Sequence, residues 1–121
     1  MIYYRTVSVE EILEEIRSAS LALPGAYEKL SHGAPCFFIE KKGQFSFFVN
    51  DHHGDGRLAL WLATPPGLQE SLIEEDPSSY FRPPYVGVRG WIGVRLDREL
   101  DWQEVKDLIE LAHSTISAKK R

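Results

Sequence analysis

The residues of this chain that could carry out chemistry include a histidine four positions before the single cysteine. His32 and Cys36 are the types that form a thiolate–imidazole pair in nucleophilic catalysis. The segment between them reads as the start of a strand, so the two side chains could meet only if the chain folded back on itself. We therefore expect no catalytic dyad. His32 is interpreted either as a turn residue that fixes its loop or as a hydrogen-bonding group at the edge of a pocket.

A second polar segment contains two adjacent histidines between carboxylates: Asp51, His52, His53 and Asp55. A metal centre needs three or four converging ligands, whereas neighbouring side chains in a loop usually point apart. The segment 54–56 also lacks the length and the following Lys-Ser/Thr of a phosphate-binding loop. We expect a solvated loop with no metal, nucleotide or cofactor.

No part of the sequence brings together a nucleophile, a base and a group that orients the base. The glutamates are numerous, but they lie on segments whose apolar stripes predict core-facing helices with solvated outer faces. The sequence therefore predicts a protein that is not an enzyme.

Three helices follow from capping signals and from apolar residues at helical spacing. Ser8 with Glu11 forms a capping-box pattern and starts a helix over 9–22. Thr64 followed by two prolines predicts a second helix that ends near Asp76. Asp101 with a glutamate three residues later starts the third helix, which has the clearest apolar stripe.

Four segments have strand patterns, and two shorter ones could be extended. The strands are 35–41, 44–50, 57–63 and 90–97, and the shorter pieces lie near 27–30 and 84–88. Short loops at 42–43 and 51–56 can join only antiparallel neighbours. The fold class predicted for 1–121 is a single α+β domain, a two-layer sandwich whose antiparallel sheet has helices mainly on one face.

Alternation along the strands predicts one core face and one open face. The core face would carry Phe45, Phe47 and Val49, then Leu58, Leu60 and Leu62, then Ile92, Val94 and Leu96. The opposite face would mix aromatic rings with arginines, which are residue types that anchor interfaces. Its candidate binding residues are Phe38, Phe48, Arg57, Trp61, Trp91 and Arg95, with His32 at the edge. Burial of this face by self-association or by a loop is the alternative interpretation.

Charge and cysteine content restrict the partners. The formal net charge is −4, whereas proteins that wrap nucleic acid need clustered Lys and Arg to neutralise phosphates. Both terminal helices are also acidic. A single cysteine cannot form an intramolecular disulfide, which favours a cytoplasmic location. No apolar run approaches the roughly 20 residues that a membrane span needs.

Several segments, in their order along the chain, resemble the MmcQ/YjbR family. They are Leu23-Pro24-Gly25-Ala26, Ser31-His32-Gly33-Ala34-Pro35-Cys36-Phe37, Leu58-Ala59-Leu60-Trp61, Pro83-Pro84-Tyr85-Val86-Gly87, Arg89-Gly90-Trp91-Ile92-Gly93-Val94-Arg95-Leu96-Asp97 and Asp101-Trp102. The resemblance covers nearly the whole chain. It implies an α-β(3)-α-β(2)-α order, similar to secretion chaperones and to the CyaY-like (frataxin-like) group, and it brings no catalytic residues.

The resemblance also implies a DNA-binding label, which rests on fold similarity and not on a site. Two binding hypotheses follow. In the first, the aromatic and arginine face binds nucleic acid, with single strands the best fit because bases stack on rings while arginines meet phosphates. In the second, the same face binds a protein partner or a second copy of the chain, as a chaperone-like module.

Overall fold

The computed structural model describes residues 8–99 and 101–119, and this part of the chain has the predicted α+β fold. Its helices are α1 (Val9–Leu21), α2 (Leu68–Glu75) and α3 (Trp102–Ser117). Its strands are β1 (Ala26–Ser31), β2 (Ala34–Ile39), β3 (Gly43–Asn50), β4 (Leu58–Leu62), β5 (Tyr80–Phe81) and β6 (Ile92–Arg95). Two 3-10 turns, η1 (His52–Gly54) and η2 (Val86–Arg89), lie between them.

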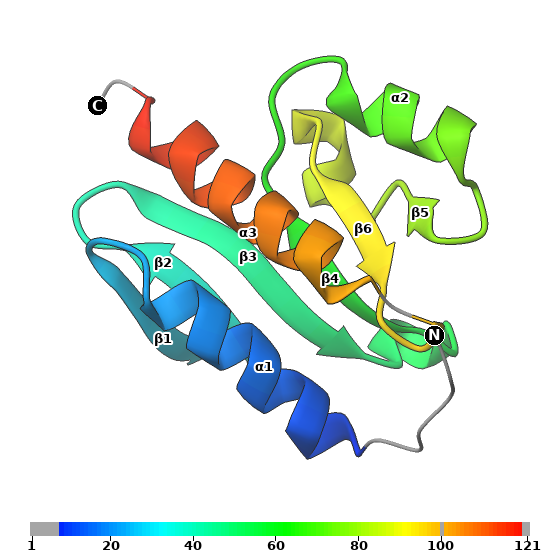
Figure 1. Cartoon of the computed structure of the whole chain (residues 1–121), viewed down its shortest axis with the longest axis horizontal. Helices are drawn as coiled ribbons and strands as arrows, with labels where there is room; N and C mark the ends of the chain where they lie inside the picture. The colour runs from blue at the N-terminus through cyan, green and yellow to red at the C-terminus, as the bar shows by residue number, and fades with distance from the viewer. Residues whose placement is uncertain (1–7, 100, 120–121) are drawn as a thin grey trace.

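The strands form one antiparallel sheet in the order β1-β2-β3-β4-β6-β5. Figure 1 shows α1 and α3 side by side across one face of this sheet, with α2 standing beside β5 at the far end. The two-layer arrangement with helices mainly on one face is therefore confirmed.

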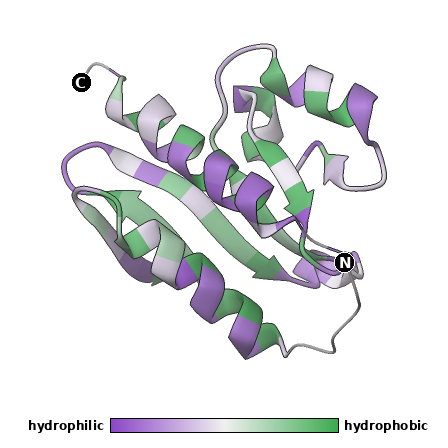
Figure 2. Cartoon of the chain, viewed as in Figure 1, coloured by the Kyte–Doolittle hydropathy of each residue, from purple (hydrophilic) through white to green (hydrophobic). Residues whose placement is uncertain are grey.

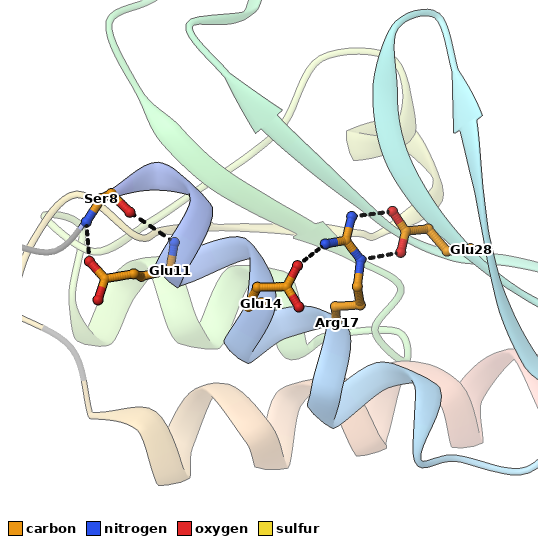
Figure 3. Close-up of polar contacts among 5 residues, drawn as sticks. All are labelled: Ser8, Glu11, Glu14, Arg17 and Glu28. Carbon is orange, nitrogen blue, oxygen red and sulfur yellow. Dashed lines mark hydrogen bonds and ion pairs between the residues drawn. The ribbon is translucent and has the colours of Figure 1, made fainter.

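The first helix begins where its capping box predicts. The Glu11 amide donates to the Ser8 hydroxyl at 3.1 Å, and the Ser8 amide donates to the Glu11 carboxylate at 2.9 Å (Figure 3). At α3 the Asp101 carboxylate accepts from the amides of Gln103 and Glu104. Both caps satisfy amides that the first turn of a helix leaves unpaired.

The second helix starts later than its sequence signal predicts. It begins at Leu68, after Gly67 with a φ of 89°. Thr64 does not cap it, because its side chain is buried and its hydroxyl donates to the carbonyl of Gly90 at 2.5 Å. A contact 26 residues away along the chain decides the role of this threonine.

The strands near the ends of the sheet differ from the predicted ones. The short extended piece near 27–30 is a full strand, β1, whereas 84–88 is not a strand and contains part of η2. On the side away from β4, β6 pairs with β5, a strand of two residues that no sequence pattern had indicated.

The register assigns each strand residue to a face, because residues directly opposite each other in an antiparallel pair share a side. One row runs across four strands as Phe48, Leu60, Val94 and Tyr80. The Tyr80 hydroxyl donates to the Glu104 carboxylate on α3, so this row lies on the side of the helices, here called the helix face. The row Cys36, Phe47, Trp61, Gly93 and Phe81 lies on the other side, the second face.

This register corrects the predicted phase between β3 and β4. Phe47 was expected to share the core face with Leu60, and Phe48 was expected on the open face. In the structure Phe48 lies opposite Leu60 and is buried on the helix face, whereas Phe47 lies opposite Trp61. Alternation was right within β4 and within β3 from Ser46 to Asn50, whereas Phe45 does not share the face of Phe47. The phase was wrong because the loop between the strands sets which residues face each other.

An irregularity between β2 and β3 places two consecutive residues in the core. Phe37 lies opposite Ser46 and Phe38 opposite Gln44, so Phe45 has no partner on β2. Such a bulge interrupts the alternation of side chains. Phe45 and Ser46 are both fully buried, and the Phe45 ring meets the edge of His113 on α3.

The core lies between the helix face and the inner sides of α1 and α3. Ile12 and Ile16 of α1 and Val105, Ile109 and Ala112 of α3 are buried against it. In Figure 2 apolar colour concentrates in the strands, while α1 and α3 carry polar stripes. None of the described helices is long and apolar enough to cross a membrane.

We expect Gly93→Ala to destabilise the fold because Phe81 occupies the space above Gly93. A Cβ at this position would lie 2.4 Å from the Phe81 ring. The free energy of unfolding, measured with urea, should fall by about 1–3 kcal/mol, the usual cost of overpacking. In a Phe81→Ala background the same change should cost much less. An equal cost in both backgrounds would contradict the steric explanation.

Candidate nucleic-acid interface

The structure divides the second face into a covered part and an open part. The covered part lies over β4 and the start of β6, where Trp61 and Trp91 are each only 2% exposed. The expectation that these tryptophans offer contact area is therefore wrong. The alternative that a loop covers this part of the sheet is the one the structure supports.

Aromatic contacts and a buried amide hold the cover in place. The His52 ring of η1 lies 5.0 Å from Trp61, and the Tyr85 ring lies 5.9 Å from His52. The side-chain amide of Gln69, buried on α2, donates to the carbonyls of Gly87 at 2.9 Å and Trp91 at 2.5 Å. Buried polar groups in such networks fix one arrangement of the chain.

The two candidate arginines lie at the margin of the covered part, and their contacts differ. The Arg57 guanidinium sits 4.1 Å from the centre of the Phe81 ring, a cation–π contact that leaves its charge without a described anion. Arg95 instead donates twice to Asp97, at 2.9 Å each. This pair raises the pKa of Arg95 and lowers that of Asp97. Arg57 can still meet an outside anion, whereas Arg95 already has one.

The open part of the second face lies over β1, β2 and β3. We call the residues Tyr27, Lys29, Phe38, Gln44 and Phe47 the open platform. The Tyr27 and Phe38 rings stack with centroids 5.5 Å apart and planes 15° from parallel. The Lys29 ammonium lies 4.8 Å from the centre of the Phe38 ring. Tyr27 is 42% exposed, and Phe38 and Phe47 are partly exposed.

A two-residue turn positions this platform. His32 and Gly33 have φ angles of 53° and 78°, the positive pair that a tight hairpin requires. The turn sets β1 against β2, so that Tyr27 faces Phe38 and Lys29 faces Cys36. His32 is exposed at the tip and is a turn residue, as one of its two interpretations had it.

Sequence reasoning found Phe38 but missed Tyr27 and Lys29. The signal was present: the alternation in 26–31, followed by a histidine–glycine pair and a second alternating run, is typical of a hairpin. The sequence analysis gave 27–30 only as a short extended piece and did not pair it with the next strand, so Tyr27 and Lys29 were assigned to no face.

Cys36 lies on the second face between Lys29 and Phe47, and its thiol is buried. It is fully buried, and its Sγ donates to the carbonyl of Ala34 at 3.3 Å. Burial raises the pKa of this thiol to about 11. The exposed His32 lies at the tip of the hairpin, and no contact joins it to Cys36.

The charge layout separates the two sides of the molecule. The outer surfaces of α1 and α3 carry exposed carboxylates: Glu10, Glu14, Glu15, Asp107 and Glu110. The second face carries three cations on aromatic rings, Lys29 on Phe38, Arg57 on Phe81 and Arg89 on Trp91. None of these three cations has an ion pair within the described residues. An anionic ligand would meet attraction on the second face and repulsion at the helices.

Other kinds of site find less support. Within 8–99 and 101–119, no three His, Cys, Asp or Glu side chains are grouped to hold a metal ion. A cavity of about 200 Å³ between α1 and α3 is lined by residues that include Ala19, Ala22, Lys106 and Glu110. It is smaller than the roughly 300–1,000 Å³ of typical small-molecule pockets.

Comparison with known proteins identifies the relatives of this fold. The family model described as YjbR matches residues 21–115. A crystal structure of the Deinococcus radiodurans protein DR2400, described with the domain DUF419, superimposes with a TM-score of 0.75 at 19% identity, covering 88% of this chain and 79% of that one. No match was found among curated proteins. The expectation of one domain over 1–121 stays a prediction.

We expect the native Cys36 thiol to resist modification. With a pKa of about 11, its thiolate fraction at pH 8 is about one in a thousand, and the thiolate is the reactive form. A disulfide reagent such as dithionitrobenzoate should react slowly with native protein and at the ordinary rate in denaturant. Rapid stoichiometric reaction of the native protein would contradict this assignment.

The Arg95–Asp97 pair should make stability depend on pH. The folded state lowers the pKa of Asp97, so its contribution is present above the unfolded value near 3.8 and is lost as pH falls through the lower folded value. Asp97→Asn should be less stable than the parent by about 1 kcal/mol at pH 7, with the difference shrinking towards pH 3. Urea titrations at both pH values test this, with the exposed Glu74→Gln as control.

Proposed function

We propose that this chain, which belongs to the YjbR family, binds single-stranded nucleic acid on its open platform. The observation that carries the proposal is the Tyr27–Phe38 ring stack with the Lys29 ammonium on it, displayed on a sheet face. Proteins that bind single strands place aromatic rings on an open surface for bases and cations beside them for phosphates.

The electrostatic layout supports binding on this face alone. Lys29 lies within the platform, and Arg57 and Arg89 belong to the same face further along the sheet. A strand that crossed the second face would meet these cations and avoid the carboxylates of α1 and α3. With about three cations engaged, the logarithm of affinity should fall with the logarithm of salt concentration with a slope of about −2.

The proposal keeps part of the predicted set of binding residues and replaces the rest. Phe38 and Arg57 stay as contact residues, and Tyr27 and Lys29 take the place of the buried tryptophans. The role assigned to the platform is binding, with no catalytic step, in the reducing cytoplasm that the single cysteine favours.

A protein-interaction function is the second candidate, and a different observation favours it. Tyr85 and Val88, beside and within η2, are 70% and 78% exposed, more than is usual for large apolar side chains. An apolar protein interface at this loop should depend little on salt, whereas nucleic-acid binding should weaken steeply.

Binding can be tested by fluorescence anisotropy with a fluorescein-labelled oligothymidine. The parent should bind at low salt, and Phe38→Ala should weaken binding about tenfold or more, because stacking is worth about 1–3 kcal/mol per base. Lys29→Ala should weaken binding and reduce the salt slope by about 0.7. A parent chain that fails to bind at low salt would contradict the proposal.

Matched controls separate the platform from the rest of the surface. Tyr85→Ala removes an exposed ring outside the platform, and Lys106→Ala removes an exposed cation on α3. Both variants should bind like the parent. Equal losses in Tyr85→Ala and Phe38→Ala would mean that the platform is not the binding site.

A further inference from the structure

Strand β1 is the first strand of the sheet, and its outer edge has no partner among residues 8–99 and 101–119. In an antiparallel pair every second residue directs its amide and carbonyl away from the partner strand, so about half of the six residues of Ala26–Ser31 present backbone groups that β2 does not use. An unpaired edge of this length is a template for another strand, and proteins usually shorten, twist or cover such edges.

Exposed apolar side chains gather along this edge. Leu30 on β1 is 69% exposed, Tyr27 on the same strand is 42% exposed, and Leu21 at the end of α1 is 42% exposed. Within the described residues, three of the five exposed large apolar side chains thus lie on β1 or just before it. The edge therefore offers both hydrogen-bonding groups and apolar surface.

The two faces of the sheet restrict how a second copy could pair with this edge. Glu28 lies on the helix face, where Arg17 of α1 donates to it at 2.5 Å and 2.7 Å (Figure 3), and Leu30 shares that face by alternation. Tyr27 and Lys29 lie on the second face. An antiparallel pairing that keeps both helix layers on one side must oppose residues of the same face.

Two centred registers oppose five residues each, and their charges differ. With Glu28 opposite Glu28, the Tyr27 ring meets Lys29 of the second copy, and Leu30 meets Ala26. With Lys29 opposite Lys29, two ammonium groups face each other directly, which is destabilising. In the register centred on Glu28, each Glu28 carboxylate already forms an ion pair with Arg17 of its own chain. The repulsion between the two central carboxylates is therefore reduced.

We propose that two copies of this chain pair through β1, antiparallel and centred on Glu28, to form one continuous sheet. The ring of Tyr27 then lies against the Lys29 ammonium of the second copy twice, once on each side of the axis. Leu30, which is 69% exposed in one copy, covers Ala26 of the second copy. This inference goes beyond the proposed function, because it involves no nucleic acid.

The mass in solution tests the pairing. Light scattering on the parent without nucleic acid should give a dimer at about 0.5 mM, and dilution should dissociate it. Leu30→Asp should weaken dimerisation tenfold or more, whereas Val88→Asp, at a similarly exposed position on η2, should leave it unchanged. A parent that is monomeric at this concentration would overturn the proposal. The unpaired edge of β1 would then be available only to a strand of another protein. A dimer that Leu30→Asp does not weaken would also overturn it.

Cysteine substitution tests the register. In the proposed dimer the two Cα atoms of residue 28 face each other about 5 Å apart, within the range that a disulfide can bridge. The two Cα atoms of residue 29 are offset by two positions along the strands and lie more than about 7 Å apart, beyond that range. Under mild oxidation Glu28→Cys should form a covalent dimer much faster than Lys29→Cys, with the buried Cys36 silent in both. Faster linkage of Lys29→Cys would overturn the register.

Phe38→Ala separates this proposal from the proposed function. Phe38 lies on β2, one strand away from the edge, so its removal should leave the dimer intact while it weakens binding to oligothymidine. A dimer in the absence of oligothymidine binding would support the pairing and reject only the nucleic-acid function.

Discussion

The burial of β4 on both of its faces determines what the rest of the molecule can offer. All five residues of this strand, Leu58–Leu62, are buried. An antiparallel sheet with helices on one side commonly leaves the other side to water. Among the residues that the structure describes, η1 and the segment around η2 cover the second face over β4, and the open part of this face lies over β1, β2 and β3.

At the β5 end of the sheet, an aromatic ring fills the space that a glycine leaves free. Phe81 lies over Gly93, and Arg57 lies over Phe81, so a glycine, a ring and a guanidinium are layered at the end of the sheet. Gln69 fixes the other side of this region through the carbonyls of Gly87 and Trp91. The tryptophans are therefore part of the hydrophobic core. Their size and apolar area stabilise the fold and give no contact surface.

Local signals in the sequence predicted local structure well. The caps at Ser8 and Asp101 depend on residues within one helical turn, and both were found as predicted. Alternation within β4 and from Ser46 to Asn50 of β3 was also right, because neighbouring side chains in a regular strand must point to opposite faces. The fold class followed from these patterns and from the short hairpin loops.

The errors came from relations that a local pattern does not contain. The loop between β3 and β4 sets the phase between the strands, and a shift of one residue exchanged Phe48 with Phe47. The bulge at Phe45 and the contact of Thr64 with Gly90 depend on distant parts of the chain. The prediction that Trp61 is exposed was wrong for the same reason, because the residues that cover this side chain belong to a separate loop. The candidate binding site therefore lies over β1, β2 and β3, near the β1 edge of the sheet, and not over the tryptophans of β4 and β6.

Strand β1 carries both proposed interactions, and its alternation separates most of their contacts. Glu28 and Leu30 point to the helix side, where α1 and a second copy can meet them, whereas Lys29 points to the open side next to Phe38. Tyr27 is the residue that both interactions share, since its ring stacks on Phe38 and lies at the pairing edge. Pairing centred on Glu28 would place two platforms side by side across the axis. Each Lys29 would then lie between an aromatic ring of its own chain and one of the second copy, so the joined surface would bind a longer strand than either platform alone.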